Sequence, residues 1–316
     1  MDVVSPTWEQ ALLSTEFLDD ASVETLPEAI AVRPQVDPTS SEPISRSLRP
    51  VINSLSLKLS ILIPVCNEEA TVAQAIRQVL DVDYPCDVEL IVVDDASADR
   101  THDLLSQVND DRMIVYRHQV SQGKGAALLS AASLATGSYI LLFDADLEYS
   151  AEDIPRLLRP VLASRCSVVY GTRLFGYNTV YQSYWYARRN RWLTRLANLL
   201  FDACIHDLHT CLKLIPIEIF DQLPLSEPGF GLDIEMTALM LKQGVRPFEV
   251  PVSYYSRSHL QGKKISWRDA AACVRILLRV RTWTRSTDSA IRRRQFGSVY
   301  GTAVICPDES ALSKAC

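Results

Sequence analysis

From Lys58 onward, apolar segments alternate with segments of helical periodicity, and this alternation restricts the fold more than any other feature of the chain. Buried strands are predicted at residues 59–65, 88–93, 113–117, 139–143 and 167–170. Helices are predicted between them at about 67–80, 99–107 and 125–135. The first of these helices is expected to have acidic residues in its first turn. Strands that are apolar throughout need helices on both faces. The expected fold class is therefore α/β, with a doubly wound, mostly parallel sheet.

Polar side chains gather in the turns that follow three of these strands. The turns are Pro64–Glu68, Asp94–Asp95 and Asp144–Asp146. In an open α/β sheet, ligands bind in the crevice at the carboxyl ends of the strands. The three turns therefore predict one ligand site at one edge of the sheet.

The most acidic of these turns holds Asp144, Asp146 and Glu148 at alternate positions. Their side chains share one side if the backbone stays extended after the strand. Carboxylates this close repel one another unless a cation lies between them, and Mg²⁺ or Mn²⁺ prefers such oxygen ligands. A metal site is therefore expected at Asp144 and Asp146, with Glu148 as a third ligand. A solvated acidic turn is the alternative for so short a motif.

Glycine motifs for other nucleotide ligands are missing. The turn Pro64–Glu68 has no glycine, which argues against a dinucleotide-binding dehydrogenase, and Gly123-Lys124-Gly125 lacks the rest of a P-loop. The acids instead suit a metal that bridges a diphosphate. Asp95 can accept hydrogen bonds from a base or ribose, and Lys124 can bind phosphate. A solvated loop lysine is the alternative for Lys124.

The two ends of the chain differ in charge and composition. Residues 1–56 hold nine acidic and three basic residues, six prolines and no glycine, and are expected to form a largely disordered arm. Residues 256–294 hold eleven basic and two acidic residues, which favours an anionic partner. The eight cysteines form no C-x-x-C pair and are expected to be reduced. No signal peptide or transmembrane segment is predicted.

Four motifs in order resemble those of family 2 glycosyltransferases with the GT-A fold: Pro64–Glu68, Val92–Thr101, Gly123–Ala127 and Asp144–Leu147. More narrowly, they resemble the dolichol-phosphate mannosyltransferase group, which moves a sugar from a nucleotide-sugar to a polyprenyl phosphate. The resemblance runs from about Lys58 to Trp283. It implies a catalytic domain over 57–256, an acceptor loop and amphipathic interface helix over 257–283, and a basic, flexible tail over 284–316.

The resemblance also implies the residues that bind the donor. The nucleotide-sugar is expected to contact Pro64, Cys66, Glu68, Val93, Asp95, Lys124, Asp144, Ala145 and Arg173. Cys66 stands where the mannosyltransferases commonly have an aromatic residue, so the base of the nucleotide stays open. Glu148 stands where close relatives often have Gln. Arg173 belongs to a Gly-Thr-Arg motif and would contact the phosphates, with a surface salt bridge as the alternative.

On the acceptor side, the stretches Asp207–Lys213, Phe230–Glu235 and Glu249–Arg257 resemble those that close the active site and begin the acceptor loop. Arg257 and Lys263 have the family's spacing for two cations that gather the donor diphosphate and the acceptor phosphate, and they join Asp144 and Asp146 as expected catalytic residues. Fixed cations would offset the repulsion between two anionic substrates. A solvated basic loop is the alternative.

Two segments, 188–201 and 266–283, are basic and amphipathic. In the second, Trp267, Ala270, Ala271, Val274, Leu277 and Leu278 form an apolar stripe. Such helices lie in a membrane interface with arginines near lipid phosphates, although packing on the protein core is the commoner alternative. The acceptor phosphate or lipid is expected to contact Arg188, Arg189, Arg195, Arg257, Lys263 and Lys264.

The expected activity is inverting, metal-dependent transfer of a hexose to a polyprenyl phosphate on the cytoplasmic face of a membrane, without a nucleic-acid partner. A phosphate acceptor is already ionised near neutral pH and needs no general base. One alternative is a hydroxyl acceptor on a saccharide or protein, which would need a base such as Asp233 or Glu235. Another is a non-catalytic, membrane-docked scaffold of the same fold. The sugar, UDP or GDP as its carrier, and the oligomeric state stay open.

Overall fold

The computed structural model describes residues 57–174, 179–181, 183–257, 267–283 and 304–305. Of residues 267–269 and 304–305 it describes the backbone only. The described residues belong to the compact unit Glu42–Cys316, and the other unit, Met1–Ser41, lies outside them. The predicted arm, most of the predicted tail, and the acceptor-loop residues Lys263 and Lys264 also lie outside the described residues.

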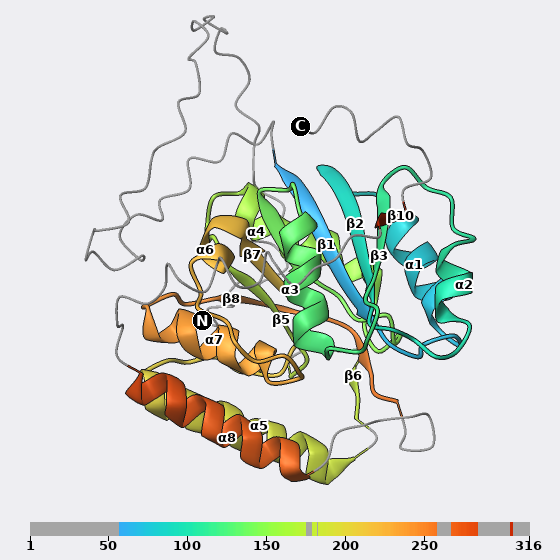
Figure 1. Cartoon of the computed structure of the whole chain (residues 1–316). Helices are drawn as coiled ribbons and strands as arrows, with labels where there is room; N and C mark the ends of the chain where they lie inside the picture. The colour runs from blue at the N-terminus through green and yellow to red at the C-terminus, as the bar shows by residue number, and fades with distance from the viewer. Residues whose placement is uncertain (1–56, 175–178, 182, 258–266, 284–303, 306–316) are drawn as a thin grey trace, which may run out of the picture. The chain divides into compact units, whose positions relative to one another are not determined.

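The core of the fold is an eight-stranded sheet with the order β10-β3-β2-β1-β4-β7-β5-β8 (Figure 1). Its strands are β1 (Lys58–Val65), β2 (Asp87–Asp94), β3 (Met113–Arg117), β4 (Tyr139–Leu142), β5 (Val169–Thr172), β7 (Lys213–Pro216), β8 (Phe248–Pro251) and β10 (Val304–Ile305). Strands β1 to β4 are parallel, β5 pairs parallel with β8, and β7 and β10 run antiparallel to their neighbours. The predicted mostly parallel sheet is confirmed.

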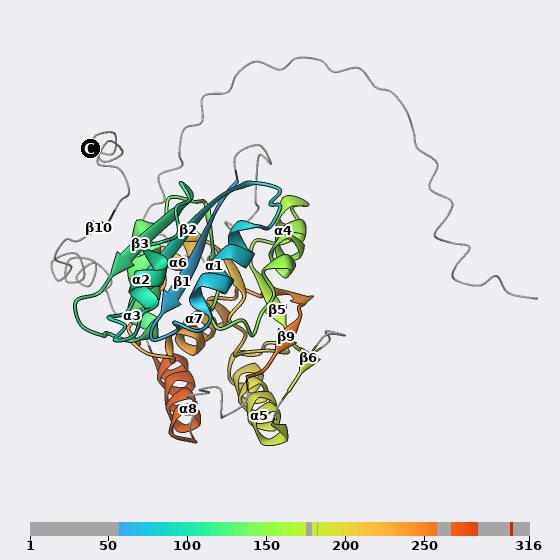
Figure 2. The ribbon, with the colours of Figure 1, turned by 90° about the vertical axis from the view of Figure 1, so that its right-hand side faces the viewer.

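Helices cover both faces of the sheet, which is why β1, β2 and β4 are apolar along nearly their whole length. The helices are α1 (Val72–Leu80), α2 (Thr101–Leu105), α3 (Lys124–Leu134), α4 (Ile154–Leu162), α6 (Ile217–Asp221) and α7 (Leu232–Lys242), with a 3-10 turn at Ala151–Asp153. Helix α3 packs on β1 and β2 from one face, and α1, α2 and α4 lie on the other (Figures 1 and 2). The sheet therefore exposes its carboxyl edge rather than its faces.

Helix α1 begins later than predicted. It starts at Val72 and has no acidic residue in its first turn, so the prediction of a helix from about Asn67 with acids in that turn is wrong. Asn67 has a φ of 55°, a left-handed conformation that does not continue into a helix. Residues 66–71 instead form a loop at the carboxyl edge of the sheet, and this loop carries Glu68.

Two long helices, α5 (Tyr184–Phe201) and α8 (Trp267–Thr282), pack side by side beyond α7 (Figures 1 and 2). Leu277 of the predicted α8 stripe is buried with Ile276 and Val280, whereas Leu278 is exposed. The stripe therefore does not face outward as a whole, because α7 covers part of it. None of the described helices is long and apolar enough to cross a membrane.

A small second sheet lies beside these helices. It pairs β6 (Thr179–Val180) with β9 (Tyr254–Tyr255) in parallel. Strand β9 leads directly to Ser256 and Arg257, and Tyr255 donates its backbone N–H to the carbonyl of Glu148 at 2.8 Å. This hydrogen bond brings the start of the acceptor loop to the turn that follows β4.

Candidate active site

The loops after β1 and β2 are joined by hydrogen bonds. The Asn67 N–H donates to Ser97 Oγ at 2.9 Å, and the Ala98 N–H donates to Asn67 Oδ1 at 2.8 Å. The Glu68 N–H donates to Thr101 Oγ1 at 2.9 Å. Within the strands, Pro64 and Val93 are direct neighbours in the β1–β2 register. The structure thus brings together the predicted nucleoside residues Pro64, Cys66, Glu68 and Val93 at one end of this strand pair.

Asp95 lies beneath the turn that leads into α3. It is only 3% exposed, and its oxygens accept four hydrogen bonds, from His118 Nδ1, Ser121 Oγ and the N–H groups of Gln122 and Gly123. Burial raises the pKa of Asp95, but these hydrogen bonds lower it more, so its pKa lies below the ordinary value. Asp95 was predicted to contact the nucleoside. Its contacts order the turn before Lys124, and the nucleoside contact stays a prediction.

Gly123 and Gly125 are explained by packing within the chain. We call residues 226–231 the 226–231 loop, and its backbone lies against this turn: the Ala126 N–H donates to the Pro228 carbonyl at 3.0 Å. A Cβ on Gly125 would lie 2.8 Å from the Gly229 oxygen, and Gly123 has a φ of +96°. Only glycine allows this close approach.

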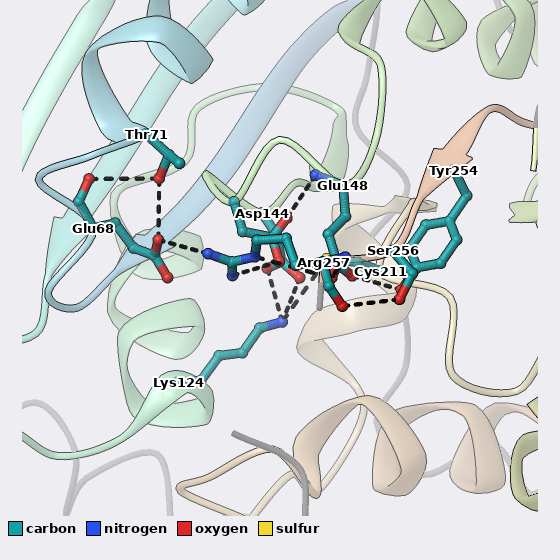
Figure 3. Close-up of polar contacts among 10 residues, drawn as sticks. Glu68, Thr71, Lys124, Asp144, Glu148, Cys211, Tyr254, Ser256 and Arg257 are labelled. Atoms are coloured by element: carbon teal, nitrogen blue, oxygen red, sulfur yellow. Dashed lines mark hydrogen bonds and ion pairs between the residues drawn. The ribbon is translucent and has the colours of Figure 1, made fainter. Parts of the chain in front are cut away.

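Lys124 neutralises the first carboxylate after β4. Its Nζ lies 2.7 Å from Asp144 Oδ1 and 2.9 Å from Asp144 Oδ2 (Figure 3). The same Nζ lies 3.9 Å from Asp233 Oδ2. Burial lowers the pKa of Lys124, but Asp144, with help from Asp233, raises it well above the ordinary value. Lys124 is therefore a fixed cation at the centre of the site. The solvated lysine considered as its alternative does not fit these contacts.

Arg257 neutralises the second carboxylate. Its guanidinium donates to Asp146 Oδ2 at 3.0 Å and to Glu68 Oε2 at 3.2 Å, and its backbone N–H donates to Glu148 Oε1 at 2.7 Å (Figure 3). Burial, followed by the charges of Asp144 and Glu148, raises the pKa of Asp146 to about 7, although Arg257 opposes this rise. The cluster therefore carries more negative charge than its own cations offset.

The three carboxylates are predicted to share one side if the backbone stays extended after the strand, and it does not stay extended. Strand β4 ends at Leu142, and Leu147 has a φ of 59°, which turns the backbone between Asp146 and Glu148. Glu148 Oε2 accepts a hydrogen bond from the Tyr254 hydroxyl at 2.5 Å. Glu148 is thus tied to β9, and the sequence held no local signal for this partner.

The donor atoms suit a hard divalent cation, although the described residues hold no group of three potential ligands close enough to bind one by themselves. Mg²⁺ and similar ions often use one or two carboxylates together with substrate phosphates. Burial and then the charges of Asp144 and Glu148 raise the pKa of Asp146, and a further positive charge would offset the repulsion among these carboxylates. Asp144 and Asp146 therefore fit such an ion when a diphosphate completes its ligands, and Ala145 between them is buried.

Arg173 does not join this cluster. It is buried, its Nε and Nη2 donate to Asp207 at 2.6 and 2.7 Å, and the Tyr254 ring centre lies 4.8 Å away. Burial raises the pKa of Asp207, but the Arg173 charge lowers it more, to about 2. Asp207 uses two of the five guanidinium N–H donors, so the expected phosphate contact stays a prediction, whereas the surface salt bridge considered as its alternative does not fit this buried pair. Arg173 packs on the Tyr254 ring, and the Tyr254 hydroxyl in turn donates to Glu148.

The predicted acceptor side is divided between two regions. Arg257 lies at the carboxylates, whereas Arg188, Arg189 and Arg195 lie on α5. Asp233 Oδ1 accepts from the buried Lys213 at 3.2 Å. Burial raises the pKa of Asp233, but Lys213 and then Lys124 lower it more, so the net shift is downward.

The residues that hold the carboxylate cluster also match a known family. Residues 60–223, more than half of the chain, match the family described as glycosyl transferase family 2. The chain belongs to glycosyl transferase family 2. The match of this family 2 domain includes Glu68, Asp144 and Asp146, whereas Phe230 and Arg257 come from the part of the chain that follows it.

Curated relatives of this family 2 chain include two proteins of Haloferax volcanii. The low-salt glycan biosynthesis hexosyltransferase Agl6 is 27% identical over 222 residues, which cover 66% of this chain and 51% of Agl6. The glycosyltransferase AglJ is 29% identical over 203 residues, which cover 62% of this chain and 63% of AglJ. The chain thus spans about half the length of Agl6 and less than two thirds of AglJ.

Solved structures of glucosyl-3-phosphoglycerate synthase from Mycobacterium tuberculosis share the fold of this family 2 chain. The complex with UDP has a TM-score of 0.56 and 20% identity, over 73% of this chain and 82% of that one. The complex with Mn²⁺, UDP-glucose and phosphoglyceric acid has a TM-score of 0.55 and 21% identity, over 73% of this chain and 81% of that one. At this identity the likeness establishes the fold, and the predicted GT-A fold is confirmed.

Proposed function

We propose that this chain transfers a hexose from a nucleotide-diphospho-sugar to a polyprenyl phosphate at a membrane surface, with inversion at the anomeric carbon. The observation that carries the proposal is the meeting of Glu68, Asp146 and Arg257 at the carboxyl edge of a family 2 glycosyltransferase fold. Donor-side carboxylates and the first cation of the acceptor loop thereby lie within hydrogen-bond distance of each other. An enzyme that joins two anionic substrates needs both kinds of group in one place.

The donor side is supported by charge and by a protein with the same fold. Glucosyl-3-phosphoglycerate synthase was solved with Mn²⁺ and UDP-glucose, which favours a Mn²⁺ or Mg²⁺ ion and a nucleotide-sugar here. A divalent ion held by Asp144 and Asp146 would neutralise charge on the leaving nucleoside diphosphate. Lys124 and Arg257 supply the remaining positive charge from the two sides of the cluster.

The proposal of a phosphate acceptor rests on the two candidate general bases, Asp233 and Glu235, because neither is well placed to accept a proton. Glu235 has both carboxylate oxygens engaged by Ser226 and by the backbone of Glu227. Asp233 is paired with Lys213, and its lowered pKa makes it a weak proton acceptor. An acceptor that is already an anion, such as a phosphate, needs neither group. Arg257 and Lys263 would hold that phosphate against the anomeric carbon.

The membrane proposal rests on the outward face of α5. Trp185, Trp192 and Leu199 follow one another at seven-residue spacing and are each more than half exposed. Arg188, Arg191 and Arg195 are exposed between them. Apolar rings among arginines suit the boundary between acyl chains and anionic headgroups. We propose peripheral contact on the cytoplasmic face through this helix.

The proposed activity is tested by a transfer assay. The full chain is incubated with Mn²⁺, a panel of radiolabelled UDP- and GDP-hexoses, and polyprenyl phosphate in vesicles of phosphatidylcholine and phosphatidylglycerol. We expect a labelled lipid product with the wild type, and none with Asp146→Ala, whose circular dichroism should match the wild type. Label on a saccharide or protein without polyprenyl phosphate would instead favour a hydroxyl acceptor. Absence of nucleotide-sugar binding would favour the scaffold.

Membrane contact is tested separately by vesicle flotation. Trp192→Ala should reduce flotation with phosphatidylglycerol vesicles, because the variant removes an exposed ring from the α5 face. Phe248→Ala removes a comparably exposed ring from β8 and is the matched control. Equal loss in both variants would contradict a specific role for α5.

A further inference from the structure

The 226–231 loop brings an exposed aromatic ring to the edge of the carboxylate cluster. Phe230 is 56% exposed, and its ring centre lies 5.7 Å from Lys124 Nζ. The same Lys124 contacts Asp144 and approaches Asp233. A group bound at Lys124 and Asp144 would therefore have the Phe230 ring as its neighbour.

The loop that carries this ring is held by Glu235. That side chain is buried, and its carboxylate accepts the N–H groups of Ser226 and Glu227 at 2.8 and 2.9 Å and the Ser226 hydroxyl at 2.7 Å. Three hydrogen bonds to one ionisable group fix the start of the loop. The use of Glu235 is therefore structural, at the base of the loop that carries Phe230.

Helix α8 holds the same loop from the other side. Arg279 Nη2 lies 2.9 Å from Glu235 Oε1 and 2.8 Å from Glu227 Oε1. A Cβ on Gly231 would lie 2.5 Å from Ile276 Cδ1, so the loop also touches α8 through its backbone. With Gly125 and Ala126 of α3 against Pro228, the loop is clamped between two helices. Because both helices hold the loop, the exposed Phe230 ring has a fixed position, unlike most single apolar side chains on a protein surface.

We propose that Phe230 packs against the C–H face of the donor hexose, and that Glu235 and Arg279 are positioning residues that hold the ring there. This inference rests on the proposed function. The face of an aromatic ring is electronegative and attracts weakly positive C–H groups, which a pyranose presents on one face. The ring adjoins Lys124, the cation available to the diphosphate, and the hexose is the part of the donor that continues from that diphosphate.

The test compares two ligands that differ only in the sugar. Calorimetry on the full chain with Mn²⁺ measures the Kd of the nucleotide-sugar that binds and of its nucleoside diphosphate. Phe230→Ala should weaken nucleotide-sugar binding about fivefold, since an aromatic contact contributes about 0.5–1.5 kcal/mol, and should leave the nucleoside diphosphate unchanged. Phe230→Trp should keep the wild-type ratio of the two Kd values, nucleotide-sugar to nucleoside diphosphate. Phe230→Leu should raise this ratio as Phe230→Ala does. Phe248→Ala, on β8, is the matched control and should alter neither Kd.

The positioning pair is tested through the same ratio. Arg279→Gln should shift it in the direction of Phe230→Ala by about twofold, and the double variant should add nothing to Phe230→Ala alone, because both act through one contact. Arg77→Gln, on the distant face of α1, should leave the ratio unchanged. Equal weakening of both ligands by Phe230→Ala, or no weakening, would overturn the inference while the proposed function stands. Failure of the wild type to bind any nucleotide-sugar would overturn both.

Discussion

Arg257 donates to Asp146 across 3.0 Å and so joins two loops that lie 111 residues apart in the sequence. The same guanidinium contacts Glu68 and lies 3.9 Å from Glu148. One arginine therefore contacts three carboxylates. A divalent ion at Asp146 would have to compete with this arginine.

We expect Arg257→Gln to bind free Mn²⁺ about tenfold more tightly than the wild type when no nucleotide is present. The reason is that a hydrogen bond between two charged groups contributes about 1.5–3 kcal/mol, and the variant no longer sets it against metal binding. Electron paramagnetic resonance of unbound Mn²⁺ at pH 8 measures this affinity while Asp146 is ionised. Arg156→Gln breaks a separate pair with Asp153 and serves as the control. Unchanged or weaker Mn²⁺ binding in Arg257→Gln would refute the competition.

Asp146→Asn should stabilise the ligand-free chain by about 1–2 kcal/mol at pH 8, with a smaller gain at pH 5. The pKa of Asp146 rises from 3.8 to about 7 on folding. Between these values the folded chain holds a proton that the unfolded chain has lost, so stability falls as the pH rises toward 7. Urea unfolding at both pH values measures the difference. Asp83→Asn, at an exposed site, should give no comparable gain. A gain of the same size at both pH values would contradict the role of this titration.

The sheet was predictable because its strands are covered on both faces. Strand β3 has the predicted bounds, β1 begins one residue earlier than predicted, and β2 extends one residue further at each end. A run such as Ile61–Ile63, fully buried, leaves a continuous apolar signal in the sequence. The loops left no such signal. Asn67 and Leu147 are left-handed, and the side chains of Asn67 and Glu148 accept hydrogen bonds from Ala98 and Tyr254, which lie far away in the sequence.

The position of the site could be predicted from the sequence, but the pairing of its charged residues could not. Three polar turns after parallel strands must share one edge, and Glu68, Asp144 and Asp146 do lie there. Which cation pairs with which carboxylate depends on segments far apart in the chain. Arg257 reaches Asp146 because the backbone of Tyr254 and Tyr255 pairs with that of Glu148 and Tyr149, and Arg173 lies opposite the buried Asp207. Neither relationship follows from periodicity.

Arg173→Gln should destabilise the chain by about 3–5 kcal/mol, because it leaves Asp207 charged and buried without its partner. Chemical unfolding measures the loss. Arg112→Gln breaks the exposed pair with Asp110 and should cost less than about 1 kcal/mol. A stable Arg173→Gln protein that has lost affinity for nucleoside diphosphate would show instead that Arg173 acts on the phosphates.

Gly125 and Gly229 should respond differently to alanine. A Cβ on Gly125 would collide with the backbone oxygens of Glu227 and Gly229, and neither can move without disturbing the 226–231 loop. Gly125→Ala should therefore cost about 1–3 kcal/mol, as overpacking does in a close-packed region. A Cβ on Gly229 meets nothing within 4 Å, so Gly229→Ala should change the free energy of unfolding by less than about 0.5 kcal/mol. Urea unfolding of the two variants distinguishes this backbone contact from a phosphate-binding role for Gly125, which predicts a stable Gly125→Ala protein with impaired nucleotide binding.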